Sequence, residues 1–177
     1  IAEPGGFYLG NSARQRRWQT LSGKAAFRAH ALPSSILPEA AAKRVDSSTL
    51  ILQTLRSHDQ YNTSVYDLDD RYRGIRGERK VLFIHPSDLE RLGFVAGERV
   101  DLHSLWDDGV DRSVTGFRLV PYDLPLGNLA AYFPETNPLV PLESFGEFSS
   151  TPTSKSIAVR LRRTAEEKAL IAGVPVR

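Results

Sequence analysis

The hydrophobic positions of this chain form short runs of strand length, separated by long polar segments. Residues 48–55 (STLILQTL) and 80–85 (KVLFIH) are almost continuously apolar, which predicts strands buried on both faces. Residues 97–105 and 155–163 instead alternate between apolar and polar side chains, as expected of strands with one buried face. The spacing of hydrophobic positions along the chain is therefore mainly that of β-strands.

Weaker signals predict further strands. Asp108-Gly109 is a dipeptide typical of hairpin tips, so residues 113–123 (SVTGFRLVPYD) are expected to return antiparallel to the preceding strand. Residues 24–30 (KAAFRAH) form another short candidate strand. Several prolines between residues 121 and 141 predict a loop in that region.

Two short helical segments are expected. In the first, Ser87 or Asp88 caps the amino end of a single turn, and Gly93 ends it in the left-handed conformation. The second lies near the C-terminus, where it begins at Thr164 and is ended by Gly173.

These elements predict a mainly β fold. About six short strands with one or two helical turns favour a small closed barrel, because closure removes exposed strand edges. Residues 1–23 contain many Gly, Ser and Arg residues and show no sustained period, so we interpret residues 1–45 as an extended arm or linker. Residues 46–177 are then the barrel domain.

The polar segment 56–74 does not fit either period. Loops longer than about 12–15 residues are uncommon inside compact domains and are usually functional or disordered. The first half of this segment is dense in hydrogen-bonding side chains, namely Arg56, Ser57, His58, Asp59, Gln60, Tyr61, Asn62 and Thr63. We interpret it as a binding loop, the alternative being a polar loop satisfied by its own hydrogen bonds.

The chemistry of this loop suits a nucleotide-like ligand. Arg56 offers a planar fork for phosphate, and Ser57 and Asn62 add neutral donors. Asp59 can accept hydrogen bonds from a guanine, and Tyr61 can stack on a flat ring.

Two more loops are candidates for the same site. Residues 127–141 (GNLAAYFPETNPLVP) carry Tyr132 and Asn137, and residues 150–159 (STPTSKSIAV) carry Lys155 as a phosphate contact. Loops at the ends of barrel strands converge at a rim, so we expect the three loops to meet there.

Composition places the chain among ordinary globular proteins. Of its 177 residues, 41% are hydrophobic and 25% charged. It has no apolar stretch of about 18 residues and no signal peptide, so we expect a soluble protein without a membrane role. It has no methionine, even at position 1, which predicts that it is part of a longer polypeptide.

Several kinds of catalytic site are excluded. Without cysteine there is no disulfide, thiolate zinc site or cysteine nucleophile, and a cytoplasmic location is the expectation. The four histidines are widely spaced, so no metal site is predicted, and no GxSxG motif occurs. We expect no complete catalytic constellation within the chain.

Two other functions remain open. The pI of about 9.0 and the stretch ARQRRWQ favour a nucleic-acid-binding module that uses the basic arm, although the net charge of only +2 weighs against it. The arm can also be a docking segment, with Phe7, Tyr8, Leu9 and Trp18 packed against a partner.

The ordered series TLRSHDQYNT, HPSDLERLGFVAGERVDLHS, AAYFPETNPLVP and STPTSKSIAVRL resembles the C-terminal, cofactor-binding domain of molybdopterin oxidoreductases. The likeness is greatest to formate-dehydrogenase-like alpha subunits. The upstream stretch GGFYLGNSARQRRWQTLSGKAAF is similar to the segment that leads into that domain.

The resemblance implies a double-psi β-barrel that closes over bis-(molybdopterin guanine dinucleotide) carrying molybdenum or tungsten. The cofactor-binding positions it implies are Thr54, Arg56, Ser57, His58 and Asn62 in the first loop, then Tyr132, Asn137 and Lys155.

The resemblance also implies that the rest of the enzyme lies upstream. The metal ligand and any iron–sulfur cluster belong to those domains, which are the expected partners, so the isolated chain is expected to be inactive. Formate oxidation is one reaction that the resemblance suggests. The first loop, HDQYNT, departs from the more aromatic, cysteine-containing loop of related dehydrogenases, which leaves the substrate open.

Overall fold

The computed structural model describes residues 3–62 and 65–165 of the chain. The chain divides into two compact units, Ile1–Ser34 and Ser35–Arg177. Residues 3–34 form turns and extended segments without a helix or strand, so the strand predicted at 24–30 was wrong. Phe27 in that segment is 93% exposed, and no strand among residues 3–62 and 65–165 pairs with this segment to supply the hydrogen bonds that its backbone would need.

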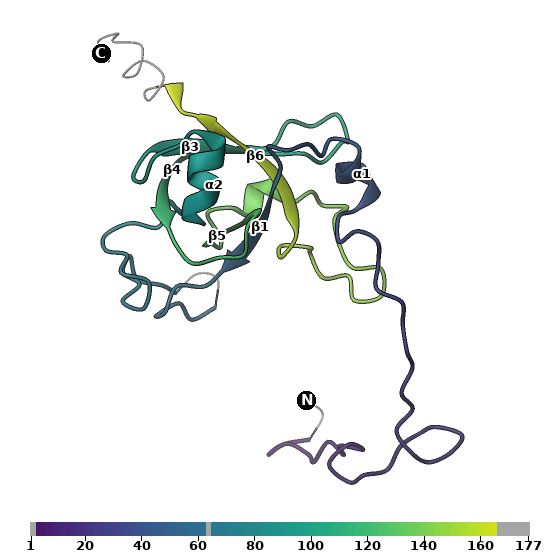
Figure 1. Cartoon of the computed structure of the whole chain (residues 1–177). Helices are drawn as coiled ribbons and strands as arrows, with labels where there is room; N and C mark the ends of the chain where they lie inside the picture. Colours follow the sequence, from purple (N-terminus) through teal and green to yellow (C-terminus); the bar gives the residue numbers. More distant parts are fainter. Residues whose placement is uncertain (1–2, 63–64, 166–177) are drawn as a thin grey trace. The chain divides into compact units, whose positions relative to one another are not determined.

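The second unit is built around a closed barrel of six strands in the order β1-β5-β2-β4-β3-β6 (Figure 1). The first helix of this unit lies between residues 35 and 45, within the segment that we expected to be an extended arm or linker, and the domain boundary at residue 46 stays a prediction. The elements along the chain are α1 (Glu39–Ala42), β1 (Leu50–Leu55), β2 (Val81–Ile84), α2 (Pro86–Leu92), β3 (Arg99–Ser104), β4 (Ser113–Pro121), β5 (Asn128–Tyr132), the 3₁₀ helix η1 (Asn137–Leu139) and β6 (Ile157–Arg163).

The strand pairing has an internal two-fold symmetry. Two pairs are parallel, β1 with β5 and β2 with β4, and the other four pairs are antiparallel. Exchanging each of the first three strands with the strand three places later in the chain leaves every pair and its direction unchanged. This arrangement confirms the expected mainly β fold with a six-stranded double-psi barrel.

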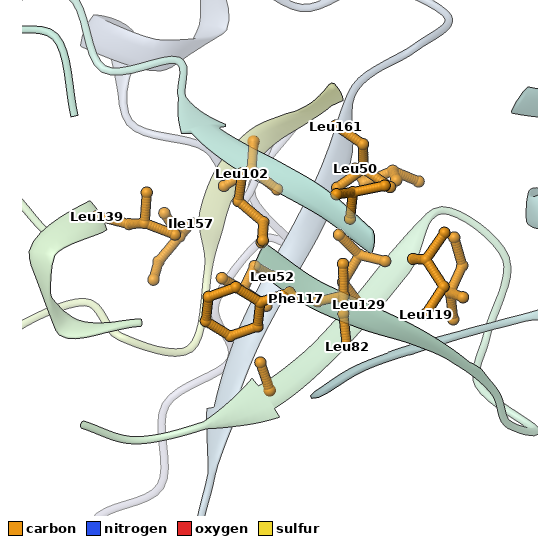
Figure 2. Packing of buried hydrophobic residues seen from close by; sticks show 14 of the residues in the cluster. Leu50, Leu52, Leu82, Leu102, Phe117, Leu119, Leu129, Leu139, Ile157 and Leu161 are labelled. Atoms are coloured by element: carbon orange, nitrogen blue, oxygen red, sulfur yellow. The ribbon is translucent and has the colours of Figure 1, made fainter. Parts of the chain in front are cut away.

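The barrel interior is filled by aliphatic side chains and one phenylalanine from all six strands. Figure 2 shows these side chains projecting from different strands into a common interior. Leu89 of α2 and Leu139 of η1 join the same cluster, so both helices cover the barrel core. The completely buried members include Leu50, Leu52, Leu82, Ile84, Val100, Leu102, Phe117, Leu119 and Val159.

The two continuous apolar runs differ in burial. All four residues of β2 are buried, because Val81 and Phe83 on its outer face pack against Ile75 from the preceding loop. In β1 only one face is fully buried and Gln53 is exposed. The prediction of burial on both faces was therefore confirmed for β2 and wrong for β1.

Residues 121–141 were expected to form a loop, but Asn128–Tyr132 within this range is strand β5 of the barrel. It pairs with β1 in parallel and with β2 in antiparallel orientation. It supplies the sixth strand of the barrel, which we had expected residues 24–30 to supply. Its five residues include two alanines and are flanked by prolines, so local propensity does not favour a strand. The two neighbouring strands supply the hydrogen bonds and burial that make it one.

The caps of α2 are partly as predicted. Gly93 ends the helix with a φ of 72°, in the left-handed conformation. The amino-end cap is His85, whose Nδ1 accepts a hydrogen bond from the backbone N–H of Ser87 at 3.0 Å. Asp88 is instead buried, where its carboxylate accepts from the backbone N–H of Gly127. The helix predicted from Thr164 lies largely outside the described residues.

The three candidate loops meet at one rim, as expected. The strand directions place the carboxyl ends of β1, β3 and β5 beside the amino ends of β2, β4 and β6. The segments 56–80, 105–112 and 133–156 therefore leave from the same rim, which we call the loop rim.

We predict that Leu129→Ala lowers the free energy of unfolding of the chain by about 2–5 kcal/mol, because it opens a cavity in a core strand. Leu129 is 1% exposed. Leu126→Ala is the matched control, since Leu126 is 63% exposed and should change stability by less than about 0.5 kcal/mol. Urea unfolding followed by circular dichroism measures both, and equal effects would contradict the placement of β5 in the core.

Candidate functional site

The loop rim contains an open cleft of about 300 Å³. Its lining comes from three segments: the end of β1, the residue after β5, and the loop before β6. The lining residues are Thr54, Leu55, Arg56, Phe133, Thr151, Pro152, Ser154 and Lys155.

Backbone hydrogen bonds join the three segments. The N–H of Thr54 donates to the carbonyl of Ser154 at 3.0 Å, and the N–H of Phe133 donates to the carbonyl of Leu55 at 2.9 Å. The ammonium of Lys155 also donates to the Thr54 carbonyl. Because these contacts extend the strand pairing beyond the barrel, the base of the cleft is fixed by the barrel.

The cleft carries two cationic side chains. Lys155 is exposed at its base, and Arg56 is exposed at the start of the loop that follows β1. Within residues 3–62 and 65–165, the Arg56 guanidinium has no hydrogen bond or ion pair. Its five N–H donors are therefore available to an anionic ligand, for which the planar fork suits a phosphate group.

Behind the cleft, the loop after β1 is held by buried Arg79. The Nη1 of Arg79 donates to the hydroxyl of Ser57 at 2.8 Å, and its Nη2 donates to Oε1 of Gln60 at 3.1 Å. On the other side, Glu135 accepts from both Nε and Nη2 of Arg79. Ser57 and Gln60 are themselves buried, so the start of this loop is folded onto the barrel.

The second half of the same loop is anchored by Asp70. Its carboxylate is completely buried and accepts from the hydroxyl of Tyr132 at 2.8 Å and from Nη1 of Arg73 at 2.6 Å. Burial alone would raise the pKa of Asp70, but the hydrogen bonds from Arg73 and Tyr132 outweigh burial and lower the pKa below its usual value of 3.8. Burial and the bond to Asp70 raise the pKa of Tyr132, which stays protonated.

Residues 50–158 match the family described as "Molydopterin dinucleotide binding domain". The matched range contains the whole cleft and both of its cations. The chain belongs to the molybdopterin dinucleotide-binding domain family.

The relatives of this chain are much longer proteins, and some of them are named oxidoreductases. "Uncharacterized oxidoreductase" proteins of Mycobacterium tuberculosis and Mycobacterium bovis are each 50% identical over 93% of this chain. "Protein YdeP" of Escherichia coli is 41% identical over 91% of it. The chain spans only 21% of the length of these relatives.

One solved structure has a related outline. Acetylene hydratase from Pelobacter acetylenicus matches 72% of this chain and 19% of its own, with a TM-score of 0.47 and 15% identity. The family match supports a molybdopterin-binding role for residues 50–158, and the mycobacterial relatives carry the name oxidoreductase. They give no support to the nucleic-acid-binding alternative.

Of the residues predicted for this domain's ligand, Thr54, Arg56 and Lys155 meet in the cleft. Ser57 lies beneath Arg79, and Tyr132 lies in β5 rather than in a loop, where it is 1% exposed. The cofactor contacts predicted for these residues stay predictions.

The remaining predicted residues lie elsewhere on the loop rim. His58 lies against the turn at 70–74, where its Nε2 is 2.6 Å from Nη2 of Arg71. Oδ1 of Asp59 lies 3.5 Å from the same nitrogen of His58. Asn62 has a φ of 65°, a left-handed conformation that asparagine tolerates in tight turns. Asn137 is exposed at the start of η1. None of these lines the cleft.

Several residues of the site were not predicted from the sequence. Phe133, Thr151, Pro152 and Ser154 line the cleft but have no distinctive local pattern. Arg79 left one signal in the sequence, since it lies two residues before the fully buried run of β2. None of the helices in the described part of the chain is long and apolar enough to cross a bilayer.

We predict that Tyr132→Phe destabilises the domain by about 1–3 kcal/mol, because the buried Asp70 carboxylate loses a donor. Tyr122→Phe is the control, since Tyr122 is 37% exposed and its hydroxyl has no hydrogen bond within the described residues. Chemical denaturation of the two variants checks this, and similar losses would mean that the Asp70 contact does not anchor the loop.

We predict that the stability difference between the wild type and Asp70→Asn shrinks on acidification. The folded-state pKa of Asp70 is lowered, so its contribution is present above the unfolded-state pKa of about 4 and is lost as the pH falls through the folded value. Denaturation near neutral pH and at about pH 3 measures the change. Asp123→Asn, at an exposed position, is the control for the loss of a carboxylate.

Proposed function

We propose that this domain binds the dinucleotide part of a molybdopterin guanine dinucleotide cofactor in the cleft at the loop rim. The observation that carries the proposal is the pair of cations, Arg56 and Lys155, at the base of a cleft within the matched range 50–158. A dinucleotide contains a diphosphate, and two cations that line the same cleft suit that charge.

Four of the lining residues, and Asp59 on the loop that follows β1, have roles toward such a ligand. The free guanidinium of Arg56 donates to phosphate oxygens, while Lys155 supplies a point charge next to it. Phe133 and Pro152 offer apolar surface to a flat ring. Asp59, whose side chain is 56% exposed, can accept the N–H groups of a guanine that extends along the loop.

The reaction belongs to the longer protein. When bound, the cofactor supplies a molybdenum or tungsten centre that exchanges two electrons with the substrate. The residues of this chain bind and orient the dinucleotide, and the rigid barrel holds its position relative to the rest of the enzyme. We propose the bis form of the cofactor and a formate-dehydrogenase-like reaction, in line with the resemblance of the sequence.

The partner that we propose is the remainder of the same polypeptide. The relatives are about five times longer than this chain, as its 21% share of their length implies. The metal ligand and any iron–sulfur cluster are assigned to that remainder, so the isolated domain is expected to be inactive. The full-length enzyme is proposed to be cytoplasmic.

We predict that Arg56→Gln and Lys155→Gln each lower the cofactor content of the full-length protein about tenfold or more, because each removes a charge-assisted hydrogen bond to phosphate. Cofactor content is measured as metal per polypeptide and as guanine nucleotide released on acid hydrolysis. Arg162→Gln is the control, since Arg162 is an exposed arginine on β6 without an ion pair in the described part of the chain.

A wild-type content of metal and guanine nucleotide in both cleft variants would contradict the proposal. Loss of metal with guanine nucleotide unchanged would contradict the assignment of the cleft to the dinucleotide part.

A further inference from the structure

Arg79 is a buried cation that the proposed cofactor contacts do not use. Its side chain is only 4% exposed and lies just before β2, at the loop rim. Burying a guanidinium costs several kcal/mol unless its charge is paired and its donors are bonded. Arg79 therefore needs either a compensating arrangement or a function.

The compensating arrangement joins three separate segments of the chain. Nη1 bonds the hydroxyl of Ser57 at 2.8 Å and the carbonyl of Asp67 at 3.4 Å. Nη2 bonds Gln60 at 3.1 Å and the carbonyl of Phe133 at 3.0 Å. Glu135 accepts from Nε at 2.5 Å and from Nη2 at 3.2 Å.

The faces of the guanidinium are covered as well as its edges. The guanidinium carbon of Arg79 lies 3.9 Å from the ring centroid of Tyr66 and 4.9 Å from that of Tyr132. Stacking on aromatic rings is a property of the planar guanidinium that an ammonium does not reproduce in the same way. The arrangement therefore requires the fork of arginine and not merely a positive charge.

The segments that Arg79 joins are the walls of the cleft. Ser57 directly follows Arg56, and the Phe133 carbonyl belongs to a lining residue. The amide of Gln60 adds a second bond to the same Phe133 carbonyl at 2.9 Å. The third wall, formed by residues 151–155, is held separately by the contacts of Ser154 and Lys155 with Thr54.

Stability alone is a weak explanation for this network. Buried ion pairs are often no more stabilising than well-packed apolar residues of the same volume, whereas they fix a specific geometry. A ligand held by a few charged groups is sensitive to displacements of about 1 Å in those groups. A rigid connection between Arg56 and Phe133 prevents such displacements and so fixes the geometry of the cleft.

We propose that Arg79 is a positioning residue that sets the distance between the Arg56 wall and the Phe133 wall and so determines how well the cleft holds its dinucleotide. This inference rests on the proposed function. Arg79 acts through Ser57, Gln60 and Glu135 and does not itself touch the ligand.

The first test follows the loops and does not depend on bound cofactor. Hydrogen–deuterium exchange of the full-length protein, purified without cofactor, should be about tenfold faster in peptides covering 56–62 and 133–137 for Arg79→Gln than for the wild type. Peptides covering α2 and β3 should be unchanged.

Arg163→Gln is the matched control. Arg163 also pairs with a buried glutamate, Glu98, at 2.7 Å and also lies over an aromatic ring, Phe94, but at the end of β6 away from the loop rim. Its exchange in 56–62 and 133–137 should equal that of the wild type.

The second test measures metal and guanine nucleotide per polypeptide. Arg79→Gln should lower both about tenfold, as is typical when a residue that orients a ligand-binding group is removed. Arg79→Lys should lower them similarly, because one ammonium cannot bond all three segments at once. Arg163→Gln should retain the wild-type content even if its thermal stability falls as far as that of Arg79→Gln.

The outcomes separate this inference from the proposed function. If Arg56→Gln loses cofactor while Arg79→Gln keeps it, the positioning role is overturned and the cofactor site stands. Rescue by Arg79→Lys would also overturn it, as would a loss of cofactor that follows thermal stability equally in the Arg79 and Arg163 variants. Full cofactor content in Arg56→Gln and Lys155→Gln would instead sink the proposed function.

Discussion

The pairing of β1 with β6 is the contact on which the rest of the structure depends. It joins the first and last strands of the barrel in antiparallel register, with Leu52 opposite Ile157. This closure encloses the apolar interior and leaves no strand edge in the barrel free. It also brings Ser154 and Lys155 to Thr54, which forms the base of the cleft. One register thus determines both the core and the site.

The long loop after β1 is attached to the barrel by buried polar groups rather than by apolar packing alone. Arg79 bonds its first half, and Asp70 bonds its second half to the hydroxyl of Tyr132. In a low-dielectric interior such groups are costly unless every donor and acceptor is satisfied. The loop is consequently ordered in one arrangement, although it contributes little to the hydrophobic core.

Individual strands show why the local sequence was informative in some places and not in others. The strands β2 and β6 were predictable, because their apolar residues have the period and length of strands. Strand β5 was not, because its hydrogen bonds and burial come from β1 and β2, which are distant in sequence. Segment 24–30 was misjudged for the opposite reason, since it has strand-like residues but no neighbouring strand.

For the site, the amino-acid sequence was enough to predict the chemical kinds of group: a polar loop with an arginine, and a lysine ahead of the last strand. The family resemblance correctly brought these into one binding domain. That Arg56 lines the cleft while Ser57 is buried became visible only in the folded structure. The same holds for the buried side chains of Arg79 and Tyr132, which form hydrogen bonds with the loop. The physical reason is that burial and hydrogen-bond partners arise from contacts between segments far apart in the chain, such as Arg79 with Glu135. Those contacts cannot be predicted from the local pattern of the sequence.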